Sequence, residues 1–100
     1  MEKGFVMRQA KANLEIDDIF NLQFGLVFTV LIIEGEFKTG DIIEFKINEE
    51  VYARKILGIN TGTILKDGFS CIGIMIETFG DEDKLYLRNW KPQRSKARVF

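Results

Sequence analysis

Residues 16–45 read IDDIFNLQFGLVFTVLIIEGEFKTGDIIEF, and this stretch decides the fold class. It contains three apolar runs, with one break at Gly25 and a second at EGEFKTGD, residues 34–41. Gly35 and Gly40 lie within the second break, where glycine supplies the positive φ that tight turns require. Residues 43–47 alternate between apolar and charged side chains, as a half-buried strand does. The stretch therefore predicts three successive β-strands.

The rest of the chain continues this pattern. Short runs rich in Val, Ile, Phe and Thr recur between turn residues, and no window longer than about ten residues keeps a helical period. We expect strands over residues 13–22, 26–34, 41–47, 51–59, 69–77 and 84–88. A hairpin turn is expected at residues 48–50, and a crossover over residues 60–68 that pins Ile64 and Leu65 over a barrel end. Six short strands predict an all-β fold, a closed six-stranded antiparallel β-barrel.

The composition fits one domain spanning residues 1–100, of which 46% are hydrophobic. The N-terminus has no apolar core of a signal peptide, and the apolar run at residues 26–33 is too short to cross a membrane. Cys71 is the only cysteine and cannot form an internal disulfide, which favours the reducing cytoplasm. The absence of histidine excludes imidazole-based catalytic triads and zinc sites that need an imidazole ligand.

The second expected strand is apolar on both faces. Val27, Leu31 and Ile33 share one parity with Thr29, whereas the core of a small barrel accommodates only the other parity. Leaving these side chains in water would forfeit roughly 1.5–3 kcal/mol each. We expect a terminal segment, a second copy of the chain or a partner protein to cover Val27, Leu31 and Ile33.

Charge is divided unevenly along the chain. Residues 1–83 hold all fifteen acidic residues, while residues 84–100 hold six basic residues and no acid. The basic tail, residues 89–100, follows directly on Arg88. Cations next to an aromatic ring favour RNA binding, because the ring can stack on bases while the cations contact phosphate. We therefore predict RNA contacts from Arg88 and from five residues of the tail: Trp90, Lys91, Arg94, Lys96 and Arg98. Two alternatives remain: a solvated, partly disordered end, or a tail that lies along the acidic body of this or a second copy and covers the second strand with Trp90 and Phe100.

In the first expected strand, Asp18 shares the inward parity of Ile16 unless a bulge intervenes. A buried carboxylate needs hydrogen bonds, so we expect Asp18 to accept backbone N–H groups or the Thr29 hydroxyl. A ligand pocket at Asp18 is the alternative.

Residues 16–45, together with LKDGFSCIGIMIETFGDED at residues 65–83, resemble the second, β-barrel domain of translational GTPases such as elongation factor Tu. Those domains read I-E-D-V-F, a short glycine loop, a strand containing T-G, and then E-x-G-x-I-K-x-G-D. The resemblance implies a barrel of the translation-protein type that binds without catalysing. It also implies that Asp17, Asp18, Phe20 and Thr29 match positions that line the pocket for the end of aminoacyl-tRNA.

This sequence departs from the pattern of that family. The glycine loop is shortened to Phe24 and Gly25 and lacks the arginine, Val30 replaces a glycine, and Leu31 and Ile33 replace charged residues. No phosphate-binding glycine loop occurs, so a nucleotide is not expected. The sequence resembles a barrel detached from its GTPase and resurfaced for another contact.

Two functions follow from these features. The first is a non-catalytic binding module that contacts tRNA, the ribosome or another ribonucleoprotein. The alternative is a protein-interaction module, such as an inhibitor or immunity-type protein, that uses the outer face of the second strand or self-associates through it. No catalytic residues, cofactor, metal or membrane contact are expected.

Overall fold

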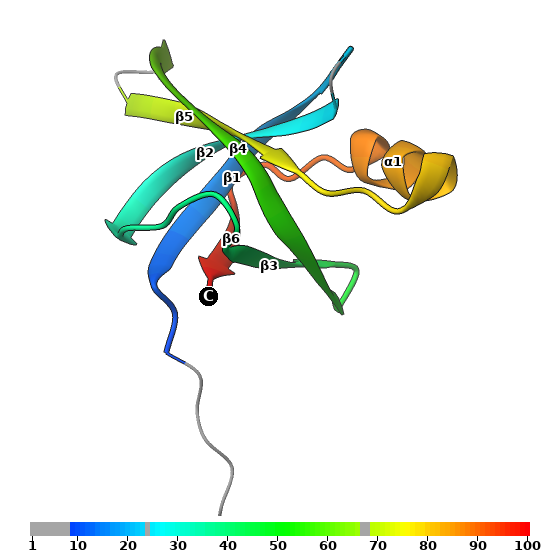
Figure 1. The fold of residues 1–100 in the computed structure, drawn as a ribbon, viewed down its shortest axis with the longest axis horizontal. Coiled ribbons are helices and arrows are strands. Elements are labelled where there is room, and N and C mark those ends of the chain that lie inside the picture. The colour runs from blue at the N-terminus through cyan, green and yellow to red at the C-terminus, as the bar shows by residue number, and fades with distance from the viewer. Residues whose placement is uncertain (1–8, 24, 67–68) are drawn as a thin grey trace, which may run out of the picture.

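The computed structural model describes residues 9–23, 25–66 and 69–100; for residues 62–66, 69 and 70 it describes the backbone alone. In this part of the chain six strands close into one antiparallel barrel with the order β1-β2-β5-β4-β3-β6 (Figure 1). The predicted fold class, a closed six-stranded antiparallel β-barrel, is confirmed. In chain order the elements are β1 Ala12–Leu22, β2 Gly25–Gly35, β3 Ile42–Ile47, β4 Glu50–Lys66, β5 Phe69–Ile76, α1 Gly80–Asn89 and β6 Ser95–Val99.

The expected strand at residues 84–88 is wrong, because these residues belong to helix α1. Acidic residues fill the first turn of this helix and Arg88 lies in its last turn, an order that complements the helix dipole. The sixth strand is instead β6, which lies within the predicted basic tail. Strand β6 pairs with β1 on one side and with β3 on the other, so the end of the tail closes the barrel.

The expected crossover at residues 60–68 is also wrong where it is described. Strand β4 continues to Lys66 and forms a long hairpin with β5, in which Ile64 pairs with Cys71 and Leu65 with Ser70. Residues 67 and 68 lie outside the described part of the chain, as do the side chains of Ile64 and Leu65. The hairpin arises because β4 absorbs two register shifts, at residues 56–58 and 60–64, without leaving the sheet.

The predicted turns form where expected. Gly35 has φ +87°, and a Cβ there would lie 2.1 Å from the carbonyl oxygen of Lys11, so no other residue fits. Gly40 has φ +100°. Between β3 and β4, Asn48 and Glu49 have φ values of 51° and 72°, the two positive values of a tight hairpin turn.

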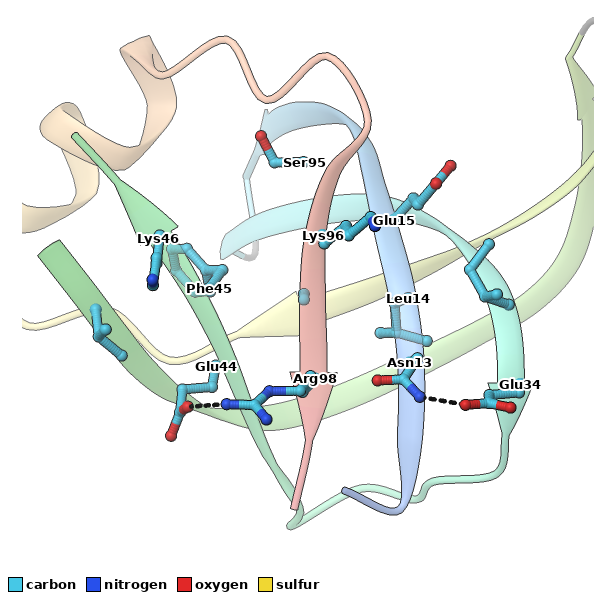
Figure 2. Close-up of a pocket in the computed structure, with 13 residues that line it drawn as sticks. Asn13, Leu14, Glu15, Glu34, Glu44, Phe45, Lys46, Ser95, Lys96 and Arg98 are labelled. Atoms are coloured by element: carbon cyan, nitrogen blue, oxygen red, sulfur yellow. Dashed lines mark hydrogen bonds and ion pairs between the residues drawn. The ribbon is translucent and has the colours of Figure 1, made fainter. Parts of the chain in front are cut away.

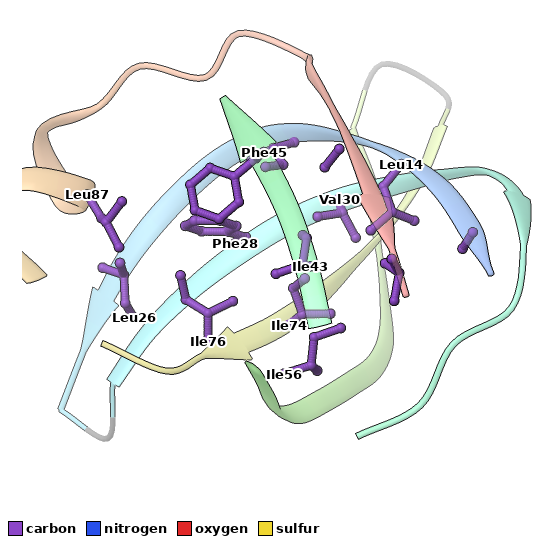
Figure 3. Packing of buried hydrophobic residues seen from close by; sticks show 14 of the residues in the cluster. Leu14, Leu26, Phe28, Val30, Ile43, Phe45, Ile56, Ile74, Ile76 and Leu87 are labelled. Carbon is purple, nitrogen blue, oxygen red and sulfur yellow. The ribbon is translucent and has the colours of Figure 1, made fainter. Parts of the chain in front are cut away.

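The core contains inward-facing side chains from all six strands and from α1 (Figure 3). The rings of Phe28 and Phe45 meet edge to face, with centroids 5.2 Å apart. Leu87 is the only buried residue of α1 and is fully inaccessible to solvent. Trp90 follows the helix and stacks on Phe45 at 5.4 Å. Helix α1 and Trp90 thus cover one end of the barrel with apolar surface.

An ion pair between the barrel and the helix holds α1 in place. Arg54 Nη2 on β4 donates to Asp83 Oδ1 at 2.6 Å, and both side chains are largely buried. The guanidinium also lies over the ring of Phe79, 4.5 Å from its centroid. The second carboxylate oxygen of Asp83 accepts the backbone N–H of Phe79, the residue before the helix. Arg54 and Asp83 therefore orient the start of α1 on the barrel.

Among the described residues, no helix is both long and apolar enough to cross a membrane.

Candidate interaction surfaces

A groove of about 810 Å³ lies on the outer side of β1, β6 and β3 (Figure 2). These strands come from distant parts of the sequence and are neighbours only because the barrel closes at β6. Alternate residues of each strand point into the groove, as the pleat requires. Ile33 of β2 and Val51 of β4 also line it, and both are 58% exposed. The polar lining side chains are Asn13, Glu15, Glu34, Glu44, Lys46, Ser95, Lys96 and Arg98.

The charges of the groove are mixed and balanced. Three acidic and three basic side chains line it. Arg98 Nη2 lies 3.5 Å from Glu44 Oε1, and the β1–β6 register places Glu15 opposite Lys96. Asn13 Nδ2 donates to Glu34 Oε1 at 2.5 Å. The groove is therefore a surface without net charge that offers both donors and acceptors.

The predicted RNA-contacting residues do not form one free basic surface. Lys96 and Arg98 lie on β6 opposite Glu15 and Glu44, and Arg94 Nε lies 3.8 Å from Asp17 Oδ1. These contacts match the alternative in which the tail lies along the acidic body of the same chain. Arg88 and Lys91 are exposed at the end of α1 and just after it, outside the groove lining.

Trp90 is packed against the core at one end of the barrel. Its ring is half-buried, stacks on Phe45 and approaches Phe28 edge-on at 6.1 Å. One of its faces is thus already used in the core. Stacking of Trp90 on a nucleic-acid base stays a prediction.

The positions that resemble the tRNA-end pocket lie at a β-bulge. Ile16 pairs with Val30 and Asp18 with Thr29, so Asp17 is the extra residue and the parity of β1 changes there. Asp18 Oδ1 accepts the N–H of Ile19 at 2.8 Å, and Thr29 Oγ1 donates to the backbone oxygen of Asp18 at 3.4 Å. The expected backbone hydrogen bond to Asp18 is confirmed, whereas the Thr29 hydroxyl bonds the main chain rather than the carboxylate.

Phe20 lies next to this bulge, pairs with Val27 and is 45% exposed. On the outer side of β1 and β2, Phe20 is a neighbour of Asp18 and Thr29. Asp17 lies close to Arg94, the residue before β6.

The predicted apolar face of β2 is divided in two. Val27 is half-buried on the outer side beside Met75, and Leu31 is only 7% exposed. Asn13 pairs with Glu34 and Leu14 with Ile32, so Ile33 is a second bulge residue, and it lines the groove instead. The predicted single face therefore ends at Leu31, because a bulge reverses the alternation.

Sequence reasoning missed the groove residues Glu15, Glu44, Lys46 and Val51. A local signal for strand β6, the middle strand of the groove, was present in the sequence: SKARV at residues 95–99 alternates polar and apolar side chains as a strand does. The composition of the tail hid this signal.

In the described part of the chain, two titratable groups outside the groove have perturbed pKa values. Asp41 accepts hydrogen bonds from Lys11 Nζ at 2.7 Å and from the N–H of Lys38 at 2.9 Å, and these bonds lower the pKa of Asp41. A hydrogen bond with Tyr86 raises the pKa of Tyr52. Asp41 joins the segments that precede β1 and β3, and the tyrosine pair joins β4 to α1.

Within the described residues, no group of three or more Cys, Asp or Glu side chains is placed to hold a metal ion. Comparison with known proteins gives no match: no protein-family model, curated protein or solved structure is significantly similar to this chain. The resemblance to the second domain of elongation factor Tu stays a prediction.

Proposed function

We propose that this chain is a non-catalytic binding module of the cytoplasm that holds a segment of another protein in the groove over β1, β6 and β3. The observation that carries the proposal is the balance of charge in the groove, three acids against three bases, with exposed apolar side chains at two of its edges.

This balance favours a polypeptide over RNA. Binding to RNA draws its affinity from an excess of cations over the phosphate backbone. In the groove, Lys96 and Arg98 face Glu15 and Glu44, so phosphate would meet carboxylates as well as cations. A protein segment with side chains of both signs matches this surface at more points.

The existing ion pairs are easily exchanged for contacts with a partner. Arg98 is 57% exposed in its pair with Glu44, and exposed pairs of this kind contribute only about 0–1 kcal/mol. A partner carboxylate at Arg98 or a partner ammonium at Glu44 would replace such a pair at small cost. Charge would then set the register of the bound segment more than its affinity.

Affinity would come from apolar anchors. Ile33 and Val51 lie on different strands beyond β1 and β3, and each exposes more than half of its surface. Burying such a side chain stabilises a complex by roughly 1.5–3 kcal/mol before the cost of association. The expected ligand is a segment with an apolar residue near each end and charges of both signs between them.

A random-peptide phage library selected against the protein tests this proposal. Recovered peptides, labelled for fluorescence polarisation, should bind the wild type and bind Arg98→Gln several-fold more weakly. Arg88→Gln is the matched control, because it removes the same charge from an exposed position on α1 outside the groove. Val51→Ser should weaken binding as well, by loss of an anchor.

A second experiment measures tRNA binding by a filter assay over a series of salt concentrations. If the affinity of the selected peptides is the same for the wild type, Arg98→Gln and Val51→Ser, the groove is not their binding site. Tight tRNA binding that falls steeply with salt and weakens in Arg98→Gln would instead support the RNA-binding function.

A further inference from the structure

The outward-facing charges of the groove form two rows that run across β1, β6 and β3. In the first row, Asn13 pairs with Arg98, and Arg98 pairs with Glu44. The side chains of this row contact one another: Arg98 lies 3.5 Å from Glu44, and Asn13 donates to Glu34 of β2. With two acids and one base, the first row has a net negative charge.

The second row has the opposite net charge. Glu15 of β1 pairs with Lys96 of β6. The β3–β6 register pairs Phe45 with Ala97, so the adjacent residues of the two strands, Lys46 and Lys96, come opposite each other. This row carries two bases and one acid. The groove is therefore neutral as a whole but polarised between its two rows.

Lys46 and Lys96 form a like-charge pair on neighbouring strands. Side chains directly opposite each other have Cβ atoms about 5 Å apart, and like charges at this distance destabilise a sheet. Both lysines are exposed, and within the described part of the chain neither is in an ion pair. Figure 2 shows Lys96 leaning toward Glu15, away from Lys46. A carboxylate between the two ammonium groups would replace their repulsion with two attractive contacts.

We infer that the bound segment carries an acidic side chain, Asp or Glu, whose carboxylate lies between Lys46 and Lys96. This inference rests on the proposed function and specifies where in the groove the negative charge of the ligand lies. Val51 pairs with Lys46 across β3 and β4 and is 58% exposed, so an apolar anchor lies next to the two lysines. The expected ligand therefore has its acidic residue beside the apolar residue that covers Val51.

A polypeptide is the favoured source of this anion. Glu15 faces Lys96, and Glu44 lies two residues before Lys46 on the same face of β3. A phosphate backbone carries negative charge on both sides of any one phosphate, so its neighbouring phosphates would meet these two carboxylates. A single carboxylate flanked by an apolar residue avoids both repulsions and matches the charges of the second row.

Fluorescence polarisation with the phage-selected peptides tests the inference. The recovered peptides should share an acidic residue next to an apolar one. The double variant Lys46→Gln/Lys96→Gln should weaken their binding about fivefold, the loss expected for exposed ion pairs. It should fold as the wild type does, since both lysines are exposed. Lys91→Gln is the matched control, because it removes the same charge from an exposed position outside the groove lining.

A second set of peptides completes a double-mutant cycle. Replacing the acidic residue of a peptide by its amide should weaken binding to the wild type by a similar factor. The double variant should bind the acidic and the amide peptide equally, because the lysines that distinguish them have been removed. An amide peptide that still binds the double variant more weakly than the acidic one would contradict the contact.

The outcomes distinguish this inference from the proposed function. Peptides that are weakened by Val51→Ser but bind the wild type and the double lysine variant equally would overturn the acidic contact and leave the groove as the site. Failure to recover any peptide, or peptides whose affinity no groove variant changes, would overturn both. If the double lysine variant weakens the binding of tRNA and not of peptides, the lysines contact phosphate and the inference is wrong.

Discussion

The buried ion pair between Arg54 and Asp83 gives the sharpest test of how the barrel holds its helix. The side chains of this pair are 9% and 16% exposed, and the atoms Nη2 and Oδ1 lie 2.6 Å apart across 29 residues of sequence. Asp83→Ala removes the carboxylate and leaves the guanidinium buried without a counter-charge. A buried charge that loses its partner destabilises a fold by about 3–5 kcal/mol, so we expect about 3 kcal/mol here, at the lower end.

The lower end is appropriate because other groups still contact the guanidinium. Arg54 Nη1 keeps its hydrogen bond to the backbone oxygen of Ala53 at 3.0 Å, and its plane keeps Phe79 and Tyr52 as aromatic neighbours. Asp83→Ala also removes the acceptor for the N–H of Phe79. These two effects act in opposite directions and are each about 1 kcal/mol.

Urea denaturation, followed by circular dichroism, measures the free energy of unfolding. The decisive comparison is a double-mutant cycle with Arg54→Met, which removes the charge and keeps the apolar stem. Once Arg54 is methionine, adding Asp83→Ala should cost less than about 1 kcal/mol, since only the hydrogen bond to Phe79 remains to be lost. Glu82→Ala, in the same turn and exposed, serves as the control and should change stability by less than about 0.5 kcal/mol.

Additive effects of Arg54→Met and Asp83→Ala would refute this reasoning. Additivity would mean that the two side chains stabilise the fold separately and not as a pair.

Two further predictions concern a turn and a carboxylate. Glu49 occupies φ +72° in the β3–β4 turn, where glycine is free of steric strain, so Glu49→Gly should raise the midpoint of urea unfolding by an amount equivalent to about 1 kcal/mol. An unchanged or lower midpoint would show that the turn is not strained. The pKa of Asp41 is lower than the ordinary 3.8, so its carboxylate stabilises the fold above pH 3.8 and loses this contribution as pH falls through the folded pKa. Asp41→Asn should therefore unfold at lower urea than the wild type at neutral pH and converge with it in acid; parallel pH profiles would contradict the pairing of Asp41 with Lys11.

The first five strands and the turns of the barrel could be predicted because their signals are local. Residues 43–47 alternate with a period of two, and Gly35 and Gly40 mark positions where a side chain would clash or strain the backbone. Such features act within a few residues of each other and need no knowledge of the partner strand.

Bulges decide which position some side chains occupy on β1 and β2, as the parity argument for Asp18 allowed. A single extra residue at Asp17 and another at Ile33 reverse the alternation in β1 and β2. The sequence around them is uniformly compatible with a strand, so only the pairing of the two strands determines where the extra residue is placed. Asp18 on the outer side and Ile33 in the groove both follow from this.

By itself, the sequence determined an all-β barrel, its early strands, its glycine turns and a surplus of apolar side chains on β2. Tertiary structure alone decided that residues 84–88 are helical and that residues 95–99 close the sheet, since the helix depends on Arg54 and on burial of Leu87 in the barrel end. Tertiary structure also assembled the groove from strands that begin at Ala12, Ile42 and Ser95. The physical reason is the separation in sequence of the residues involved. The alternation of side chains and the strain of turns depend on residues that are neighbours in the chain. The Arg54–Asp83 ion pair and the closure of the barrel depend on residues that meet only after folding.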